Sequence, residues 1–136
     1  MKYQPGLYTN MKRGNPSPAR IEDSAARLEA LGNPTRLGVF RLLVRAGDDG
    51  LPVGQLQRRL NIAPSTLSHH LRALITVDLV SQERQGTTLM CRANYKVMAS
   101  LISFLADECC ADVPSGSAAR QAFLAEIACS PKGRKE

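Results

Sequence analysis

The stretch that decides the fold runs from residue 53 to residue 80 and reads VGQLQRRLNIAPSTLSHHLRALITVDLV. It predicts two short helices joined by a tight turn. In the first, apolar residues recur at helical spacing and Asn61 ends the helix. The turn then leads to Pro64 at the first position of the second helix, where a missing N–H costs nothing. Helix, short turn and helix in this order are typical of a helix-turn-helix.

The second of these helices has two unlike faces. At about 100° per residue, Leu67, Leu71 and Leu74 fall on one side of the helix. The other side carries short hydroxyls, an imidazole and a guanidinium. Such groups suit base edges and phosphates, and a helix about 20 Å long fits the major groove. The alternative is an ordinary helical hairpin, but the polar cluster, the turn length and the basic charge favour DNA binding.

Two motifs resemble the ArsR/SmtB family of winged-helix repressors. The run STLSHHL at 65–71 is similar to that family's recognition-helix motif, and NPTRL at 33–37 is similar to the start of its second helix. The resemblance extends from about Ala25 to Cys110. It implies a dimeric repressor that binds an operator and is released by a metal or metalloid ion.

The bulk composition agrees with a small DNA-binding protein. The chain has 136 residues, a formal net charge of +6 and a sequence pI near 9.5, which favours a polyanionic partner. No apolar run reaches the length of a membrane span and the N-terminus lacks a signal-peptide core, so we expect a cytoplasmic protein with no membrane partner. Its four cysteines would then be mostly reduced.

We expect a mainly α fold with a small β-hairpin, a winged helix-turn-helix of about five to six helices plus a two-stranded wing. Residues 1–16 form a flexible N-terminal arm, residues 17–112 form the DNA-binding and dimerisation domain, and residues 113–136 form a short helix and a charged tail.

Outside the opening stretch, capping residues and apolar stripes predict helices over 17–32, 33–47, 94–110 and 118–129. The helix over 94–110 carries a stripe of Met98, Leu101, Ile102 and Leu105. We expect this stripe to form the homodimer face together with the first helix. Two-fold symmetry would then set two recognition helices about 34 Å apart, one turn of DNA.

The wing is predicted from two strands, 79–85 and 88–93, joined by a tight tip that contains Gly86. A hairpin placed directly after a recognition helix favours a phosphate or minor-groove contact over a merely solvated loop. His70 lies beside the apolar edge of its helix, so we interpret it as a boundary residue that could touch a phosphate. The predicted DNA contacts are Pro64, Ser65, Thr66, Ser68, His69, His70, Arg72, Arg84, Gln85 and Thr87.

The cysteines suggest a site for a thiophilic ion. Cys109 and Cys110 are adjacent and can present two thiolates, ligands that select soft ions over Mg²⁺ or Ca²⁺. A trivalent metalloid such as arsenite or antimonite takes three sulfurs. The third could be Cys129, with Cys91 as the alternative. For each cysteine the competing interpretation is a small buried apolar residue.

The segment 104–110, FLADECC, also resembles the C-terminal vicinal-cysteine site of arsenic-responsive members of the family. Those members often add a third cysteine a few residues later, and 111–116 contains none. Another family site needs cysteines in the helix before the recognition helix, where this chain reads GQLQRRL. Zinc is disfavoured, because the only histidines are His69 and His70 and no C-x₂₋₄-C spacing occurs.

The sequence therefore predicts a repressor that needs no cofactor to bind double-stranded DNA and takes As(III) or Sb(III) as its inducer. One alternative is a thiol redox sensor, in which Cys109 and Cys129 form a disulfide under oxidant. Another is a DNA-binding regulator with no effector. An enzyme is disfavoured, since the chain lacks C-x-x-C, a βαβ pattern and a credible Cys–His pair.

Overall fold

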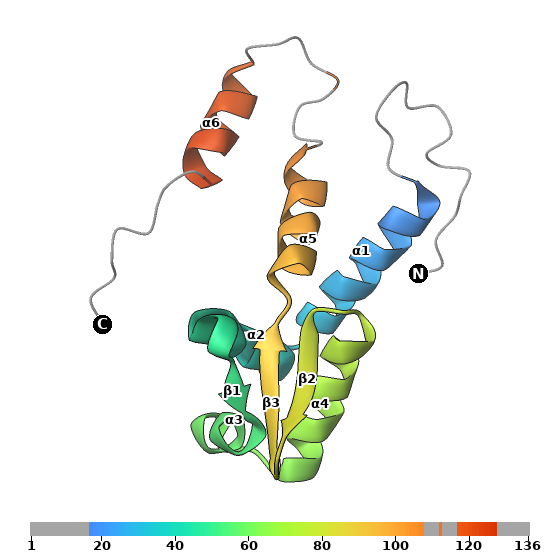
Figure 1. Cartoon of the computed structure of the whole chain (residues 1–136). Helices are drawn as coiled ribbons and strands as arrows, with labels where there is room; N and C mark the ends of the chain where they lie inside the picture. Colours follow the sequence, from blue (N-terminus) through green and yellow to red (C-terminus); the bar gives the residue numbers. More distant parts are fainter. Residues whose placement is uncertain (1–16, 108–111, 113–116, 128–136) are drawn as a thin grey trace. The chain divides into compact units, whose positions relative to one another are not determined.

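The computed structural model describes residues 17–107, 112 and 117–127 (Figure 1). The chain forms two compact units, one ending at Leu101 and the other beginning at Ile102. This division falls inside a helix, earlier than the boundary after residue 112 that the sequence suggests. The predicted arm over 1–16 lies outside the described residues.

Three of the described helices begin directly after the caps that the sequence predicts, at Ser17, Asn33 and Asn94. The described helices are α1 (Pro18–Leu31), α2 (Pro34–Ala46), α3 (Val53–Leu60), α4 (Pro64–Thr76), α5 (Tyr95–Asp107) and α6 (Ala118–Ile127). The Asn33 side chain accepts hydrogen bonds from the backbone N–H groups of Thr35 and Arg36, at 3.0 and 3.1 Å, and so caps α2. Asn94 caps α5 in the same way through the N–H of Val97, at 3.3 Å.

The turn between α3 and α4 is short because Asn61 adopts a left-handed conformation, with φ 52° and ψ 50°. Its N–H donates to the carbonyl of Gln57 at 2.8 Å and closes the end of α3. Asparagine tolerates this conformation better than most residues that carry a Cβ. The chain therefore reverses at once and enters α4 at Pro64.

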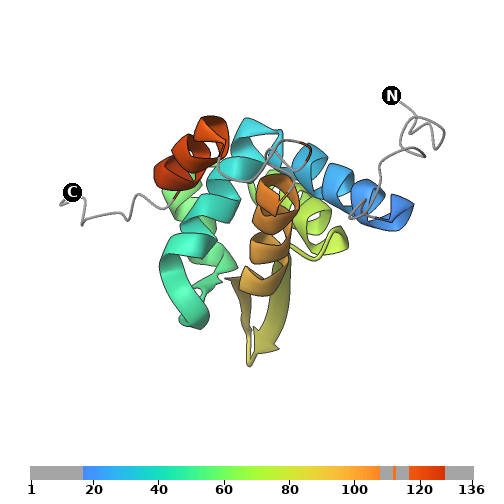
Figure 2. The ribbon, with the colours of Figure 1, turned by 90° about the horizontal axis from the view of Figure 1, so that it is seen from above.

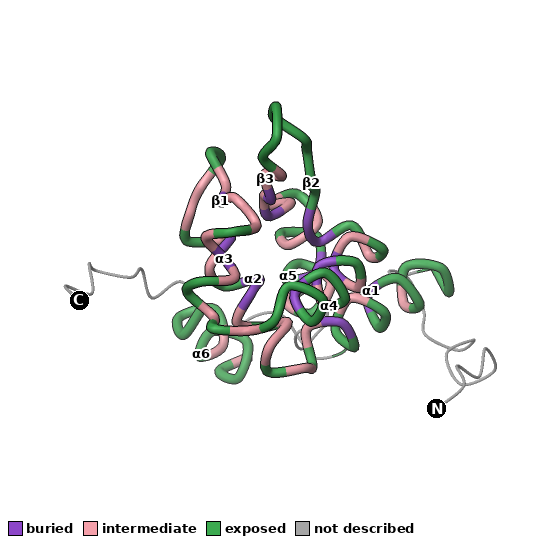
Figure 3. The backbone as a smooth tube through the Cα atoms, turned by 90° about the horizontal axis from the view of Figure 1, so that it is seen from below, coloured by how far each residue is buried: buried purple, intermediate pink, exposed green. Residues whose placement is uncertain are grey.

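The core lies where α4 packs against α2. Leu67, Leu71 and Leu74 of α4 are at most 2% exposed, and Val39 and Leu43 of α2 are fully buried. Burying a leucine side chain contributes about 1.5–3 kcal/mol. Figure 3 shows this arrangement, with the buried segments gathered inside the helices and the tip of the hairpin exposed. The packing therefore turns the polar face of α4 outward.

The sheet has three strands, whereas the sequence predicts two. β2 (Val80–Gln85) and β3 (Thr88–Ala93) form the predicted antiparallel hairpin, which projects from the helices of its unit (Figure 2). A third strand, β1 (Leu51–Pro52), pairs with the other edge of β3 and gives the order β1-β3-β2. The correction has a physical reason. Two residues, one of them proline at a sheet edge, carry no periodicity, and only tertiary pairing makes them a strand.

Gly50 allows β1 to approach β3. Its φ is +71°, and a Cβ at this position would lie 2.2 Å from the carbonyl oxygen of Cys91. Gly47 has nearly the same backbone, with φ 72° and ψ −160° against 71° and −165° at Gly50, but its Cβ would meet nothing within 4 Å. Both positions favour glycine for their dihedral angles. At Gly50, glycine is also required because any side chain would collide with β3.

No helix in the described part of the chain is long and apolar enough to cross a membrane.

These two glycines make a matched pair for a stability test. We expect Gly47→Ala to lower the free energy of unfolding by about 1–3 kcal/mol, the usual strain of this backbone region. Gly50→Ala should lower it further, because the methyl group also collides with β3. Urea denaturation of both variants measures the difference. Equal losses would mean that β1 shifts away from β3 without cost.

Candidate DNA-binding interface

The outward face of α4 carries most of the predicted contact residues. Pro64, Ser65, Thr66, Ser68, His69 and Arg72 are all exposed. The backbone carbonyl of Arg72 accepts a hydrogen bond from the Thr76 hydroxyl at 2.8 Å. Its guanidinium has no ion pair or hydrogen bond with any residue that the structure describes. The end of the side chain is therefore available to an outside partner.

His70 lies apart from this group. It is half-buried, and its Nδ1 is buried with no hydrogen-bond partner among the described residues. Burial lowers the pKa of His70 from its ordinary value, and the charges of Arg36 and His69 lower it further. The structure places His70 at the edge of the core, as the helical wheel suggested. A contact between His70 and DNA stays a prediction.

The register of the hairpin decides which wing residues face α4. Gln82 pairs with Cys91 and Arg84 pairs with Leu89, so all four side chains share one face of the sheet. Gln82 and Leu89 line a hollow together with residues of α4, which identifies this as the helix-facing side. Arg84 therefore points to the same side as α4. Gln85 and Thr87 are exposed at the hairpin tip.

Arg92 on the opposite face of the sheet is already engaged. Its Nη1 donates to Glu83 Oε2 at 2.9 Å, and its Nε donates to the backbone carbonyl of Asp48 at 3.0 Å. These bonds join the base of the wing to the turn that precedes β1. Arg92 thus stabilises the wing, and its partner Glu83 is the only carboxylate on the two wing strands.

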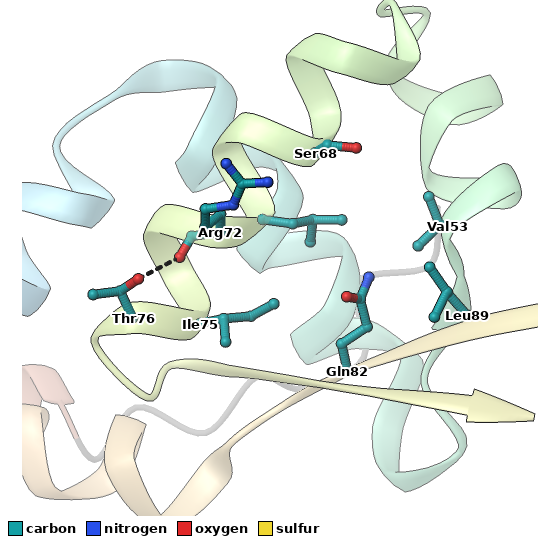
Figure 4. Close-up of a pocket in the computed structure, with 8 residues that line it drawn as sticks. Val53, Ser68, Arg72, Ile75, Thr76, Gln82 and Leu89 are labelled. Carbon is teal, nitrogen blue, oxygen red and sulfur yellow. Dashed lines mark hydrogen bonds between the residues drawn. The ribbon is translucent and has the colours of Figure 1, made fainter.

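The hollow between α4 and the wing has a volume of about 250 Å³. Figure 4 shows Ser68 and Arg72 on the helix, Gln82 on β2, and Val53 beside Leu89 at the far end. Leu71 and Ile75 complete its apolar wall. Polar donors on an apolar wall, open on one side, suit a strand of nucleic acid with its charged phosphates and apolar sugars.

The charged residues of the helix-turn-helix are all basic. Residues 51–77, which include both helices of the helix-turn-helix, contain no Asp or Glu. They contain Arg58, Arg59 and Arg72, and all three side chains are exposed. A cationic surface without carboxylates attracts a polyanion over several ångströms, in a manner that salt screens.

The C-terminal end of α4 is also held by a hydrogen bond from another helix. Arg27 of α1 donates from Nε to the backbone carbonyl of Val77 at 3.1 Å, just after the last turn of α4. Arg36 of α2 donates from Nε to the carbonyl of Ala30 at 2.6 Å, at the end of α1. These bonds tie three helices of the first unit together, so the orientation of α4 is fixed by polar contacts as well as by the core.

The structure places one of the four cysteines. Cys91 is fully buried in β3, and the Gln82 side-chain amide donates to its sulfur at 3.6 Å. Burial raises the pKa of its thiol, which disfavours the thiolate that a metalloid needs. Cys109, Cys110 and Cys129 lie outside the described residues. Within residues 17–107, 112 and 117–127, no group of three His, Cys, Asp or Glu side chains could hold a metal ion.

Sequence reasoning missed Gln82, which lines the hollow beside Arg72. The available signal was its spacing from Arg84, because residues two apart on a strand share a face. The predicted wing contacts, Arg84, Gln85 and Thr87, instead all lie near the tip of the hairpin.

Comparison with known proteins gives consistent matches. A family described as a helix-turn-helix domain matches residues 31–83. The nodulation protein NolR of Rhizobium meliloti is 30% identical, over 66% of this chain and 74% of NolR. The transcriptional repressor SdpR of Bacillus subtilis is 29% identical, over 57% of this chain and 82% of SdpR. An ArsR-like transcriptional regulator from Rhodococcus shares the fold, with a TM-score of 0.62, 22% identity and coverage of 81% of this chain and 96% of that one.

The environment of His70 predicts a pH dependence of stability. Its pKa in the folded state is lower than the ordinary value of 6.5, so the unfolded chain takes up the proton more readily. Stability should be full above pH 6.5 and should fall as the pH drops below it. We expect His70→Gln to reduce this fall, measured by urea denaturation from neutral to mildly acidic pH. His69→Gln is the neighbouring control. Because His69 is the smallest of the three causes that lower the pKa of His70, this variant should keep most of the wild-type dependence, and a larger reduction than in His70→Gln would refute the assignment.

Proposed function

Because this chain belongs to the ArsR family of winged-helix transcriptional regulators, we propose that it is a repressor which arsenite or antimonite releases from its operator. Family membership makes it a DNA-binding regulator and not an enzyme. The observation that supports the finer proposal is the pair Cys109-Cys110, which begins two residues after the last residue of α5. Thiolates in this position would allow a thiophilic ion to bind just after α5, the helix that follows the wing in the chain.

The proposed DNA contacts come from the exposed face of α4 and from the wing. Ser65, Ser68, His69 and Arg72 would enter the major groove, while Arg84, Gln85 and Thr87 would meet the backbone or the minor groove beside it. The absence of carboxylates from 51–77 supports this arrangement. Phosphate contacts would supply much of the affinity, and the side chains of α4 would select the sequence.

We further propose that the repressor is a homodimer. Ile102 and Leu105 of α5 are 55% and 54% exposed, although both belong to the apolar stripe of that helix. Leu28 of α1 is also 42% exposed. A second copy of the chain would remove these side chains from water, and two-fold symmetry would present two recognition helices to successive turns of DNA.

The inducer would bind through Cys109 and Cys110, with Cys129 as the third sulfur. The burial of Cys91 argues against it as a ligand. Coordination after the end of α5 would alter that helix and with it the spacing of the two recognition helices. A hundredfold loss of operator affinity requires about 2.7 kcal/mol of coupling, and DNA must then weaken binding of the ion by the same factor.

Arg72→Ala tests the DNA-binding face. We expect a loss of roughly 1–3 kcal/mol in affinity for the operator, because an exposed guanidinium on the recognition helix would be removed. Fluorescence anisotropy on DNA from the chain's own upstream region measures the affinity, and sedimentation checks that the oligomer is unchanged. Wild-type affinity in this variant would exclude Arg72 from the contact surface.

Replacing Cys109 and Cys110 together with Ser tests the inducer site. The double variant should bind DNA as the wild type does but should no longer be released by micromolar arsenite or antimonite. Cys91→Ser is the matched single-cysteine control, and it should still respond because Cys91 is buried in the sheet.

The same titration separates the alternatives. Zinc should have no effect on the wild-type complex. Release by peroxide that survives Cys110→Ser would indicate a redox sensor, and tight binding that neither metalloids nor peroxide affect would indicate a regulator without this effector. Either result would overturn the metalloid proposal while leaving the DNA-binding function in place.

A further inference from the structure

A second hollow lies beside the first and contains no residue of α4. It has a volume of about 360 Å³ and lies between the start of α3 and the tip of the hairpin. Its walls include Gln55 and Arg58 from α3 and Thr87 and Thr88 from the hairpin tip. We call this hollow the α3–wing notch. None of the predicted contacts except Thr87 belongs to it.

The notch continues the hollow beside α4. Val53 and Leu89 line both, so the two hollows meet at this apolar pair. Figure 4 shows Val53 and Leu89 side by side at the end of the first hollow, away from Arg72. The surface thus forms one groove, with Arg72 at one end, an apolar centre, and Arg58 at the other end.

The groups in the notch are those that bind an anion. Arg58 is its only charged side chain, is exposed, and has no ion pair or hydrogen bond with the described residues. Thr87 and Thr88 add hydroxyl donors and Gln55 adds an amide. No carboxylate lines the notch. A guanidinium with neighbouring hydroxyl donors is a common arrangement for holding a phosphate.

We propose that the α3–wing notch holds a phosphate of the DNA backbone, and that Arg58 is its principal ligand. This rests on the proposed DNA binding and extends it from α4 and the wing to the first helix of the helix-turn-helix. One DNA strand would then pass along the groove, with its apolar sugar atoms over Val53 and Leu89. The contact is independent of sequence and would fix the position of the wing on the duplex.

Arg59 provides a matched control for Arg58. The two arginines are adjacent on α3 and both are exposed, but Arg58 lines the notch and Arg59 does not. Arg58→Gln and Arg59→Gln change the net charge equally, so diffuse electrostatics would affect both alike. We would measure binding to the upstream DNA and to a random-sequence duplex of the same length, over a series of salt concentrations.

We expect Arg58→Gln to reduce the slope of log K against log salt by about 0.9, the loss of one phosphate contact. Affinity should fall by the same factor on both duplexes. Arg59→Gln should leave the slope close to wild type. An unchanged slope for Arg58→Gln, or an equal change for both variants, overturns the notch as a phosphate site.

A second pair of variants tests the hydroxyl groups without removing charge. Thr87→Val and Thr88→Val keep the β-branched shape, so the hairpin should survive, as circular dichroism can check. The double variant should bind both duplexes more weakly if the hydroxyls contact the phosphate, and wild-type affinity removes them from the site. If the wild-type chain binds neither duplex, the proposed function fails as a whole. If it binds DNA and Arg58→Gln leaves the salt slope unchanged, the notch alone fails.

Discussion

The burial of one face of α4 is the constraint on which the rest of this structure depends. Leu67, Leu71 and Leu74 have almost no exposed surface, and they pack where α2 supplies Val39 and Leu43. A helix seated in this way cannot rotate without exposing leucine to water. The polar residues between those leucines are therefore presented outward in one fixed order. The packing of the core thus decides which residues α4 presents to a partner.

The short strand β1 also fixes the position of the wing relative to the helix-turn-helix. It lies directly before α3 and pairs with β3, so backbone hydrogen bonds connect the helix-turn-helix to the hairpin with no linker between them. Gly50 permits the close approach, and Arg92 binds the preceding turn from the other side of the sheet. The helix-facing side of the wing, with Gln82 and Arg84, is therefore held in register with the exposed side of α4.

Local signals explain what the sequence revealed. Asn33, Asn61 and Asn94 act within a few residues of themselves, and the leucine spacing of α4 is visible along the chain, so helix ends and faces could be predicted. The features that could not be predicted depend on residues that are far apart in the sequence. β1 exists only because β3 is beside it, and the environment of His70 depends on Arg36 of another helix. Arg58 and Arg59 are adjacent and carry the same charge, and the notch that includes the wing tip distinguishes them.

The two ends of the wing differ in how freely they can vary. At the base, a Cβ on Gly50 would collide with β3, whereas at the tip the φ of +63° favours glycine at Gly86 but a Cβ there would meet nothing within 4 Å. A hairpin can gain or lose residues in pairs at its tip without altering the register below. The wing can therefore lengthen or shorten while α4 stays in place. In the proposed mode of binding, separate parts of the fold would thus set the choice of DNA sequence and the length of DNA that the wing contacts.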